Sequence, residues 1–274
     1  MIFMPRRWSP QEEEAYRKEL NKLYLDQNKT IAEIAKILCI SEKTVFQRLK
    51  RLEVETQPHK KPRYQNKRID IKLPKGRSAQ LAELLGIMFG DGHISHFQVT
   101  VTLGNKETKY ATYVQHLLKE IFGGKPKISI KKGGYKTVYL GSVDVVVYLR
   151  MHNLVSNKVK NQIDAPAWIF TKPTFMESFL RGFFDTDGSI YKIRYGKQIN
   201  FCNLSIPLLR SLQQMLIRLE YSPSRISCNK IYITKKSDVY RFFKEVQPQN
   251  KKHLERYREF SQCVGTQAVN EDRL

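Results

Sequence analysis

The sequence predicts an α+β fold in which two tandem αββαββα units, related by pseudo-twofold symmetry, follow an all-α helix-turn-helix domain. Two apolar helical segments both end in Asp-Gly, at residues 91–92 and 187–188. Each of them opens the same order of helix-like and strand-like segments, which indicates an internal repeat. The residues before position 54 show helical periodicity alone.

Positive charge dominates the composition, because 48 Lys and Arg residues stand against 26 Asp and Glu residues and give a net charge of +22. Such a surplus predicts a polyanionic partner, first nucleic acid and second a membrane surface. No apolar run approaches the ~18 residues of a membrane-spanning helix, and the opening "MIFMPRRWSP" does not resemble a signal peptide. None of the four cysteines forms a C-x-x-C pair, so a zinc ribbon is not indicated and an intracellular protein, in the cytoplasm or nucleoid, is expected.

Residues 1–54 are predicted to form a helix-turn-helix DNA-binding domain. The segment "SPQEEEAYRKELNKLYLDQN" starts with Ser9 as a cap and Pro10 in the first turn. "TIAEIAKILCISEKTVFQRLKRL" reads as two short helices around a turn, in which Ser41 caps the second helix and Cys39 lies near the place of the usual glycine. Any small three-helix bundle shows these stripes, and the positive charge favours the DNA-binding interpretation. The side chains offered to the major groove would be those of Glu42, Lys43, Thr44, Gln47, Arg48 and Lys50.

Residues 55–77 are predicted to be a basic linker, since they contain prolines and many cations but no helical period. The linker is either a solvated tether or a segment that follows DNA phosphates. Within it, "IDIKLP" is a candidate short strand.

The first half-domain is predicted at 78–165 and the second at 166–274. The first runs from the helix "SAQLAELLGIMFGDG" through the strand "HFQVTVTLGN", the helix "KETKYATYVQHLLKEIFG" and the strands "PKISIKK" and "KTVYLGS" to the helix "VDVVVYLRMHN". The second runs from "TFMESFLRGFFDTDG" through "SIYKIRYGKQINFCNLS", the helix "IPLLRSLQQMLIRLEY" and the strands "SRISCN" and "KIYIT" to the helix "SDVYRFFKEV".

The two Asp-Gly helices are expected to pack against each other. Gly86 and Gly182 would let their backbones approach closely, and Gly92 and Gly188 would turn the chain into each sheet through a positive φ. One Asp-Gly after an apolar helix is ordinarily a turn, but two in matching units predict a shared site. Asp91 and Asp187 would then lie together at two helix C-termini, where a divalent cation, above all Mg²⁺, would relieve their repulsion. Paired carboxylates that hold metal on a basic surface point to phosphodiester hydrolysis.

The segments "LLGIMFGDG" and "LRGFFDTDG" resemble the two signature helices of LAGLIDADG homing endonucleases, and the resemblance extends over roughly residues 78–260. It implies a monomer with two saddle-like antiparallel sheets on DNA, which cuts both strands of a long asymmetric site across the minor groove. The implied cofactor is Mg²⁺; Mn²⁺ would substitute, and Ca²⁺ would bind without cleavage.

Residue roles also follow from this resemblance. Asp91 and Asp187 would bind the metal, with help from the main-chain carbonyls of Gly90 and Thr186. Asp185 would have a structural or capping role, and Phe89 replaces it in the first copy. A basic residue near the end of the fourth strand would be Lys235 or Lys236, for which the first copy has no equivalent in "YLGSVD".

DNA-reading side chains are expected on one face of each sheet, although a one-residue error in register would invert the choice. The candidates are Gln98, Thr100, Thr102, Lys127, Ser129, Lys131, Tyr135, Tyr191, Lys192, Arg194, Asn200, Arg225, Ser227 and Tyr232. Gln98, Gln198 and Asn200 are also candidates for positioning water or bases.

Three functions are compatible with these features. The first is a site-specific double-strand DNA endonuclease with an additional DNA-binding domain. The second is a non-cleaving transcription regulator on the same scaffold, and the retained carboxylates favour the enzyme over it. The third is an RNA-splicing maturase. An intein is not expected, because the sequence begins with Met and ends "VNEDRL", without a terminal His-Asn.

Overall fold

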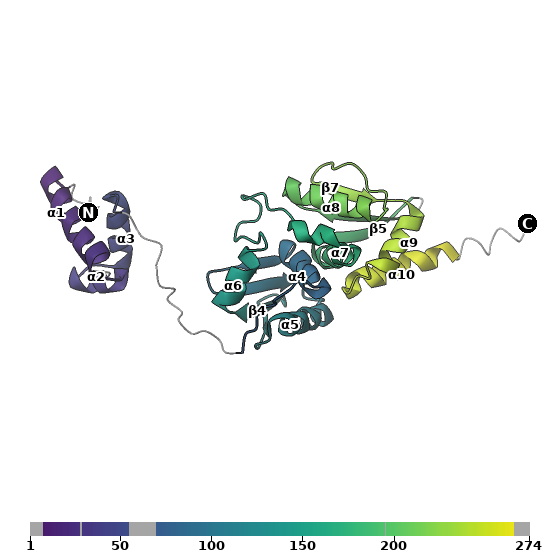
Figure 1. Ribbon diagram of the computed structural model, residues 1–274, viewed down its shortest axis with the longest axis horizontal. Helices are drawn as coiled ribbons and strands as arrows, with labels where there is room; N and C mark the ends of the chain where they lie inside the picture. Colours follow the sequence, from purple (N-terminus) through teal and green to yellow (C-terminus); the bar gives the residue numbers. More distant parts are fainter. Residues whose placement is uncertain (1–7, 28, 55–69, 195, 266–274) are drawn as a thin grey trace, which may run out of the picture. The chain divides into compact units, whose positions relative to one another are not determined.

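The computed structural model describes residues 8–27, 29–54, 70–194 and 196–265, with side chains up to residue 259 (Figure 1). The chain divides into two compact units at residue 65, and each unit has its own hydrophobic core. Most of the predicted linker, residues 55–69, lies outside the described residues. Among the described helices, none is long and apolar enough to cross a membrane.

The N-terminal unit consists of short helices, as the sequence predicts. Ser9 and Thr30 each close a capping box with a glutamate three residues later, and Ser41 accepts a hydrogen bond from the Thr44 backbone N–H at 3.1 Å. Cys39 adopts a φ of 53°, so it takes the left-handed conformation that a turn glycine would otherwise supply. The helices are α1 (Pro10–Asn21), which continues as a π-helical segment (Lys22–Asp26), α2 (Ile31–Ile37) and α3 (Glu42–Arg51).

The C-terminal unit begins earlier than the predicted boundary at residue 78. Ile71 forms a bridge with Gly123, the Lys72 N–H donates to the Phe122 carbonyl at 2.9 Å, and the Gly124 N–H donates to the Asp70 carbonyl at 2.8 Å. Residues 70–72 therefore pair with the rest of the unit, and the predicted linker is too long at its C-terminal end.

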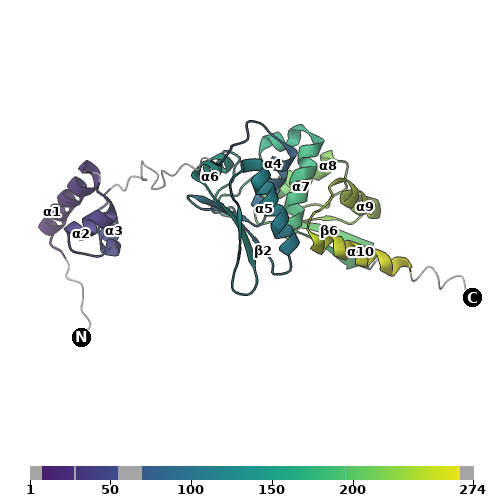
Figure 2. The ribbon, with the colours of Figure 1, turned by 90° about the horizontal axis from the view of Figure 1, so that it is seen from below.

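The first half of this unit has the predicted order. Its sheet is antiparallel with strand order β1-β2-β4-β3. Figure 2 shows helices α4 and α5 on one side of strand β2. The elements are α4 (Ala79–Phe89), β1 (Gly92–Ile94), β2 (Gln98–Leu103), α5 (Thr108–Phe122), β3 (Lys127–Ile130), β4 (Lys136–Gly141) and α6 (Val143–Arg150).

The second half repeats this order with one difference, since its sheet has three strands in the order β5-β6-β7. The predicted strand at 224–229 is wrong, because the segment forms no continuous ladder: Ser227 joins Lys230 in an isolated bridge, and the Ser224 N–H donates to the Tyr232 carbonyl at 2.8 Å. The Ser224 hydroxyl accepts the Tyr232 N–H at 3.0 Å and replaces a backbone carbonyl in the ladder. The elements are a 3₁₀ turn (Ala167–Thr171), α7 (Pro173–Asp187), β5 (Gly188–Ile193), β6 (Gly196–Cys202), α8 (Ile206–Arg218), β7 (Lys230–Ile233), α9 (Lys236–Glu245) and α10 (Lys251–Gly265). Helix α10 was not predicted from the sequence.

Helices α4 and α7 cross at two glycines and lie side by side at the centre of the unit (Figures 1 and 2). A Cβ on Gly86 would overlap the Phe179 carbonyl oxygen and come within 2.8 Å of the Phe183 nitrogen. A Cβ on Gly182 would overlap the Glu83 carbonyl oxygen and come within 2.9 Å of the Ile87 nitrogen. Each helix thus packs directly against the other's backbone, as predicted, and one hydrophobic core spans both halves.

Gly92 and Gly188 have a different role from the predicted one. Neither is among the described glycines with positive φ, so the expected left-handed turn is wrong. Each is needed because its own helix lies too close for a side chain. A Cβ would overlap Met88 in the first case and Phe184 in the second.

Candidate active site

Asp91 and Asp187 lie at the ends of α4 and α7, immediately before the first strand of each sheet. The tight crossing brings these helix ends together, since a Cβ on Gly90 would overlap the Thr186 side chain and lie 3.5 Å from the Asp187 carboxyl carbon. The predicted juxtaposition is therefore present.

The electrostatics of the pair show mutual repulsion. Burial, followed by the charge of Asp91, raises the pKa of the Asp187 carboxyl to about 6. The Asn203 side-chain N–H donates to Asp187 Oδ2 at 3.1 Å and favours the ionised form. Although the Asp91 side chain reaches solvent, loss of hydration also raises its pKa. Two crowded carboxylates of this kind favour a nearby cation.

The cation that the structure places there is Lys158, which the sequence analysis missed. Its ammonium donates to the main-chain carbonyls of Met88 at 3.2 Å and Phe89 at 3.1 Å, and also to that of Gly90. Burial lowers the pKa of Lys158, while the charges of Asp187 and Asp91 oppose that shift. Lys158 lies in the non-periodic segment that follows α6, where no sequence pattern marks it.

A second cation, Lys252, approaches from the start of α10. Its ammonium lies 2.9 Å from Glu107 Oε1, and its charge acts on both Asp91 and Asp187. Asn250 donates to the same Glu107 oxygen at 2.6 Å. These contacts connect the segment before α5 to the C-terminal helix and bring another carboxylate near Asp91.

Asp185 holds this C-terminal segment in place. Its buried carboxylate accepts the backbone N–H groups of Gln249 at 2.8 Å and Asn250 at 3.1 Å. Loss of hydration raises the pKa of Asp185 to about 7, and these two hydrogen bonds oppose the rise. The structural role expected for Asp185 agrees with these contacts.

Hard oxygen donors suit Mg²⁺, which proteins commonly bind through one or two carboxylates. Asp91 and Asp187 meet that description. Among the residues described, His, Cys, Asp and Glu form no cluster of three or more suited to a metal ion. The Gly90 carbonyl, an expected ligand, already accepts a hydrogen bond from Lys158. The Thr186 hydroxyl donates back to the Gly182 and Phe183 carbonyls, whereas the ligand role expected for the Thr186 main-chain carbonyl stays a prediction.

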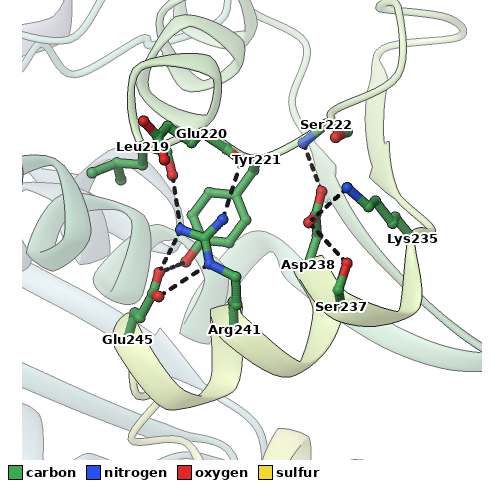
Figure 3. A network of polar contacts seen from close by, with 9 residues as sticks. All are labelled: Leu219, Glu220, Tyr221, Ser222, Lys235, Ser237, Asp238, Arg241 and Glu245. Atoms are coloured by element: carbon green, nitrogen blue, oxygen red, sulfur yellow. Dashed lines mark hydrogen bonds and ion pairs between the residues drawn. The ribbon is translucent and has the colours of Figure 1, made fainter.

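Among the described contacts, neither Lys235 nor Lys236 interacts with Asp91 or Asp187, so their catalytic role stays a prediction. Lys235 caps α9 and lies 3.9 Å from Asp238 Oδ1 (Figure 3). The charge of Lys236 acts on Lys197, which pairs with Lys192. That pair is four residues along β5 from Gly188, about 13 Å away at the rise of a strand. The last residue of β7, Ile233, pairs with Ile199, which in turn pairs with Ile190, and the two lysines follow it in the direction away from Asp187.

The outer face of the first sheet carries the predicted polar residues. Gln98, Thr100 and Thr102 alternate with the buried Val99, Val101 and Leu103. The register pairs Thr100 with Tyr139 and Thr102 with Thr137. On the other side of β4, Lys127 pairs with Tyr139 and Ser129 with Thr137. All of these side chains therefore lie on one face of the sheet. Lys131 and Tyr135 are exposed in the adjoining hairpin. Three further residues of this face escaped the sequence analysis, although alternation could have found them: His93, Thr137 and Tyr139.

The second sheet bears out only part of the prediction. Tyr191 pairs with Gln198, and Asn200 pairs with Ser189 and Tyr232, so these residues share one face. Lys192 points to the opposite face by alternation, and its assignment beside Tyr191 is wrong. Arg194 follows the last residue of β5, and Arg225 and Ser227 are exposed outside the strands.

Helix α3 presents a polar face with one exposed aromatic. Lys43, Phe46, Gln47 and Lys50 are exposed and recur at the spacing of one helix face. Thr44 instead shares a 2.7 Å hydrogen bond with Ser41, and the Arg48 guanidinium lies 4.9 Å from the ring centres of both Trp8 and Tyr16. Of the six side chains predicted on α3, Lys43, Gln47 and Lys50 lie on this exposed face.

Comparison with known families agrees with this geometry. A family model described as a LAGLIDADG-like domain matches residues 78–159 and 174–259, and each match includes one signature helix. Because the two matches cover more than half of the sequence, the chain belongs to the LAGLIDADG-like family.

Individual relatives share only a segment with this chain. A DNA polymerase of Methanocaldococcus jannaschii is 24% identical over 156 residues, which are 50% of this chain and 9% of the polymerase. A glutamine–fructose-6-phosphate aminotransferase of the same organism is 26% identical over 151 residues, which are 54% of this chain and 13% of the aminotransferase. The chain thus spans about a tenth of the length of these relatives.

Similar solved structures include a DNA complex. The N-terminal LAGLIDADG domain of DUF199/WhiA covers 66% of this chain and 89% of its own, at 19% identity and a TM-score of 0.46. I-DmoI in complex with DNA and Mn covers 61% of this chain and 96% of its own, at 17% identity and a TM-score of 0.44. At these identities the likeness concerns the fold.

Proposed function

We propose that the chain is a site-specific double-strand DNA endonuclease that hydrolyses phosphodiester bonds at Asp91 and Asp187. The observation that carries the proposal is the meeting of these two carboxylates at the ends of paired helices, directly before two sheets with polar outer faces. Family membership and the +22 charge support it. DNA is the polyanion whose cleavage this arrangement suits.

Asp91 and Asp187 would hold Mg²⁺, with Mn²⁺ as a substitute and Ca²⁺ as a binding but inactive ion. Bound Mg²⁺ supplies positive charge for the phosphate and lowers the pKa of bound water. Asn203 orients the Asp187 carboxylate through its 3.1 Å hydrogen bond. Lys158 and Lys252 supply further positive charge beside the carboxylates, where a DNA phosphate would bind.

The two outer sheet faces would read the DNA. Side chains of the first face, including Gln98, Thr100 and Tyr139, can donate to or accept from base edges. Tyr191 and Tyr232 would act in the same way on the second face. The free face of α3 would bind a major groove as part of a helix-turn-helix domain, with the protein acting as a monomer.

Cleavage of a randomised duplex library by the purified chain tests the proposal. The expected result is a set of discrete cuts with a constant stagger in Mg²⁺ and none in Ca²⁺. Retention of one sequence without any cuts would instead assign the chain to DNA-binding proteins that do not cleave.

Asp187→Asn should lower the cleavage rate on the selected site by at least about 10²-fold, the cost of removing one preorganised charge-stabilising group. Binding in Ca²⁺-free buffer should persist, because Asp187 contributes to no sheet face. Asp91→Asn should behave alike, and Asp144→Asn, at an N-terminal position of α6, is the control. Cleavage at the wild-type rate in either site variant would contradict the assignment.

One observation favours a non-cleaving regulator as the second candidate. The Lys158 ammonium already occupies the Gly90 carbonyl and partly neutralises the two carboxylates. Two carboxylates that a lysine partly neutralises can remain close together without a metal ion. The library experiment in Mg²⁺ separates the two candidates.

A further inference from the structure

The hydrogen-bond donors of the Lys158 ammonium are all used by carbonyls at the C-terminal end of α4. The ammonium has three N–H donors, and they are directed at three consecutive carbonyls, those of Met88, Phe89 and Gly90. Carbonyls in the last turn of a helix have no partner within the helix and carry its negative dipole. Lys158 therefore caps α4 from a segment more than sixty residues further along the chain.

The same ammonium also serves the carboxylate pair. Its charge acts on Asp91 and on Asp187, in opposition to their mutual repulsion. In the metal-free protein, the lysine thus provides part of the neutralisation that a divalent ion would provide.

These two roles place Lys158 in competition with metal. Asp91 and Asp187 would hold a divalent ion within the field of the Lys158 charge, which already acts on both carboxylates, and a nearby like charge weakens ion binding. A Gly90 carbonyl that is already bound to the ammonium is also a poorer ligand for metal. We propose that Lys158 is a built-in counter-ion that lowers the divalent-metal affinity of the carboxylate pair and preserves its geometry without metal. This inference rests on the proposed metal site.

Calorimetric titration of Ca²⁺ into the full chain tests the proposal without requiring cleavage. Lys158→Gln removes the charge and retains an amide donor for the carbonyls. It should tighten Ca²⁺ binding by about tenfold or more, the order expected when a nearby like charge is removed. Lys158→Arg retains the charge and should bind Ca²⁺ within about threefold of the wild type.

Lys160→Gln is the matched control, because Lys160 is exposed in the same segment and its loss changes the net charge equally. Its Ca²⁺ affinity should equal that of the wild type. If Ca²⁺ binding tightened equally in both Gln variants, the change in net charge alone would explain the effect, and the proposal would be overturned. Unchanged or weaker binding by Lys158→Gln alone would also overturn it.

Thermal unfolding provides the second readout. Without metal, Lys158→Gln should have the lower Tm, and Ca²⁺ should raise its Tm more than it raises that of the wild type. Asp187→Asn separates the two proposals. If Ca²⁺ binding depends on Asp187 but not on Lys158, the metal site stands and the counter-ion role fails. If no variant binds Ca²⁺, both fail.

Discussion

Asp185 and Phe89 occupy the same position in the two signature helices and have different functions in the fold. Asp185 binds the backbone of residues 249–250, whereas Phe89 packs edge-on against Phe179 with ring centres 5.7 Å apart. Only the second half therefore fixes its C-terminal segment through this position. The first half instead binds Lys158 through main-chain carbonyls, so the two halves place their cations by different chemistry.

His253 gives the clearest pH dependence at the residue scale. It is fully buried with its ring centre 4.4 Å from that of Phe184, and burial, then the charges of Lys252 and Arg256, lower its pKa to about 3. Because the folded-state pKa lies below the usual 6.5, the stabilisation from neutral His253 is complete above pH 6.5. It is lost as the pH falls from there towards 3.

His253→Phe should therefore unfold with a weaker acid dependence than the wild type. The difference in unfolding free energy between the two proteins should shift by about 2 kcal/mol in favour of the variant between pH 7 and pH 5. Urea unfolding at both pH values measures it, and the exposed His96→Phe is the control. Parallel pH profiles for wild type and His253→Phe would show that His253 is not the titrating group.

Among the elements, the α4–α7 crossing was predictable and the cation positions were not. The crossing follows from two apolar helices with glycines at matched positions, because only a missing Cβ permits that approach. Lys158 lies in the irregular segment before the 3₁₀ turn, which no period marks, and Lys252 lies in the first turn of α10, a helix that was not predicted. The sheet faces were predicted well in β2 and β3, where residues alternate strictly. Prediction failed at Lys192, where polar residues continue past the end of the buried pattern in β5.

Gly86→Ala should destabilise the C-terminal unit by about 3 kcal/mol, at the upper end of overpacking costs, because the added methyl would meet backbone rather than a movable side chain. Thermal unfolding measures the loss. Gly76→Ala is the matched control, since a Cβ there would meet nothing within 4 Å, and it should leave stability unchanged within about 0.5 kcal/mol. A Tm for Gly86→Ala equal to that of the control would mean that the helices do not approach as closely as the structure shows.

At the scale of the whole molecule, the two halves share one core and the N-terminal unit has its own. An ion pair between the partly exposed Arg181 and the buried Glu83, Nη1 to Oε2 at 3.1 Å, joins α7 to α4 across the halves. The halves are thus expected to unfold together, and the N-terminal unit can be removed from them.

Deleting residues 1–54 should leave folding of the C-terminal unit intact and weaken DNA binding. The slope of log K against log salt should become shallower by about 0.9 for each phosphate contact that is lost. Lys43 and Lys50 on α3 would supply two such contacts, and Lys43→Ala with Lys50→Ala in the full chain should reproduce part of the change. Salt-dependent binding assays measure it. An unchanged slope would mean that this unit does not contact the same duplex.

The backbone contact between α4 and α7 determines how the protein can change over evolutionary time. The close approach of α4 and α7, and with it the spacing of the two carboxylates, depends on main-chain contacts at Gly86 and Gly182. Substitutions in the apolar residues around the crossing can therefore accumulate at a cost in stability while the gap between Asp91 and Asp187 stays constant. The outer faces of the sheets can diverge independently of that gap, so under the proposed function a lineage could acquire a new recognition sequence while the spacing of the two carboxylates is kept.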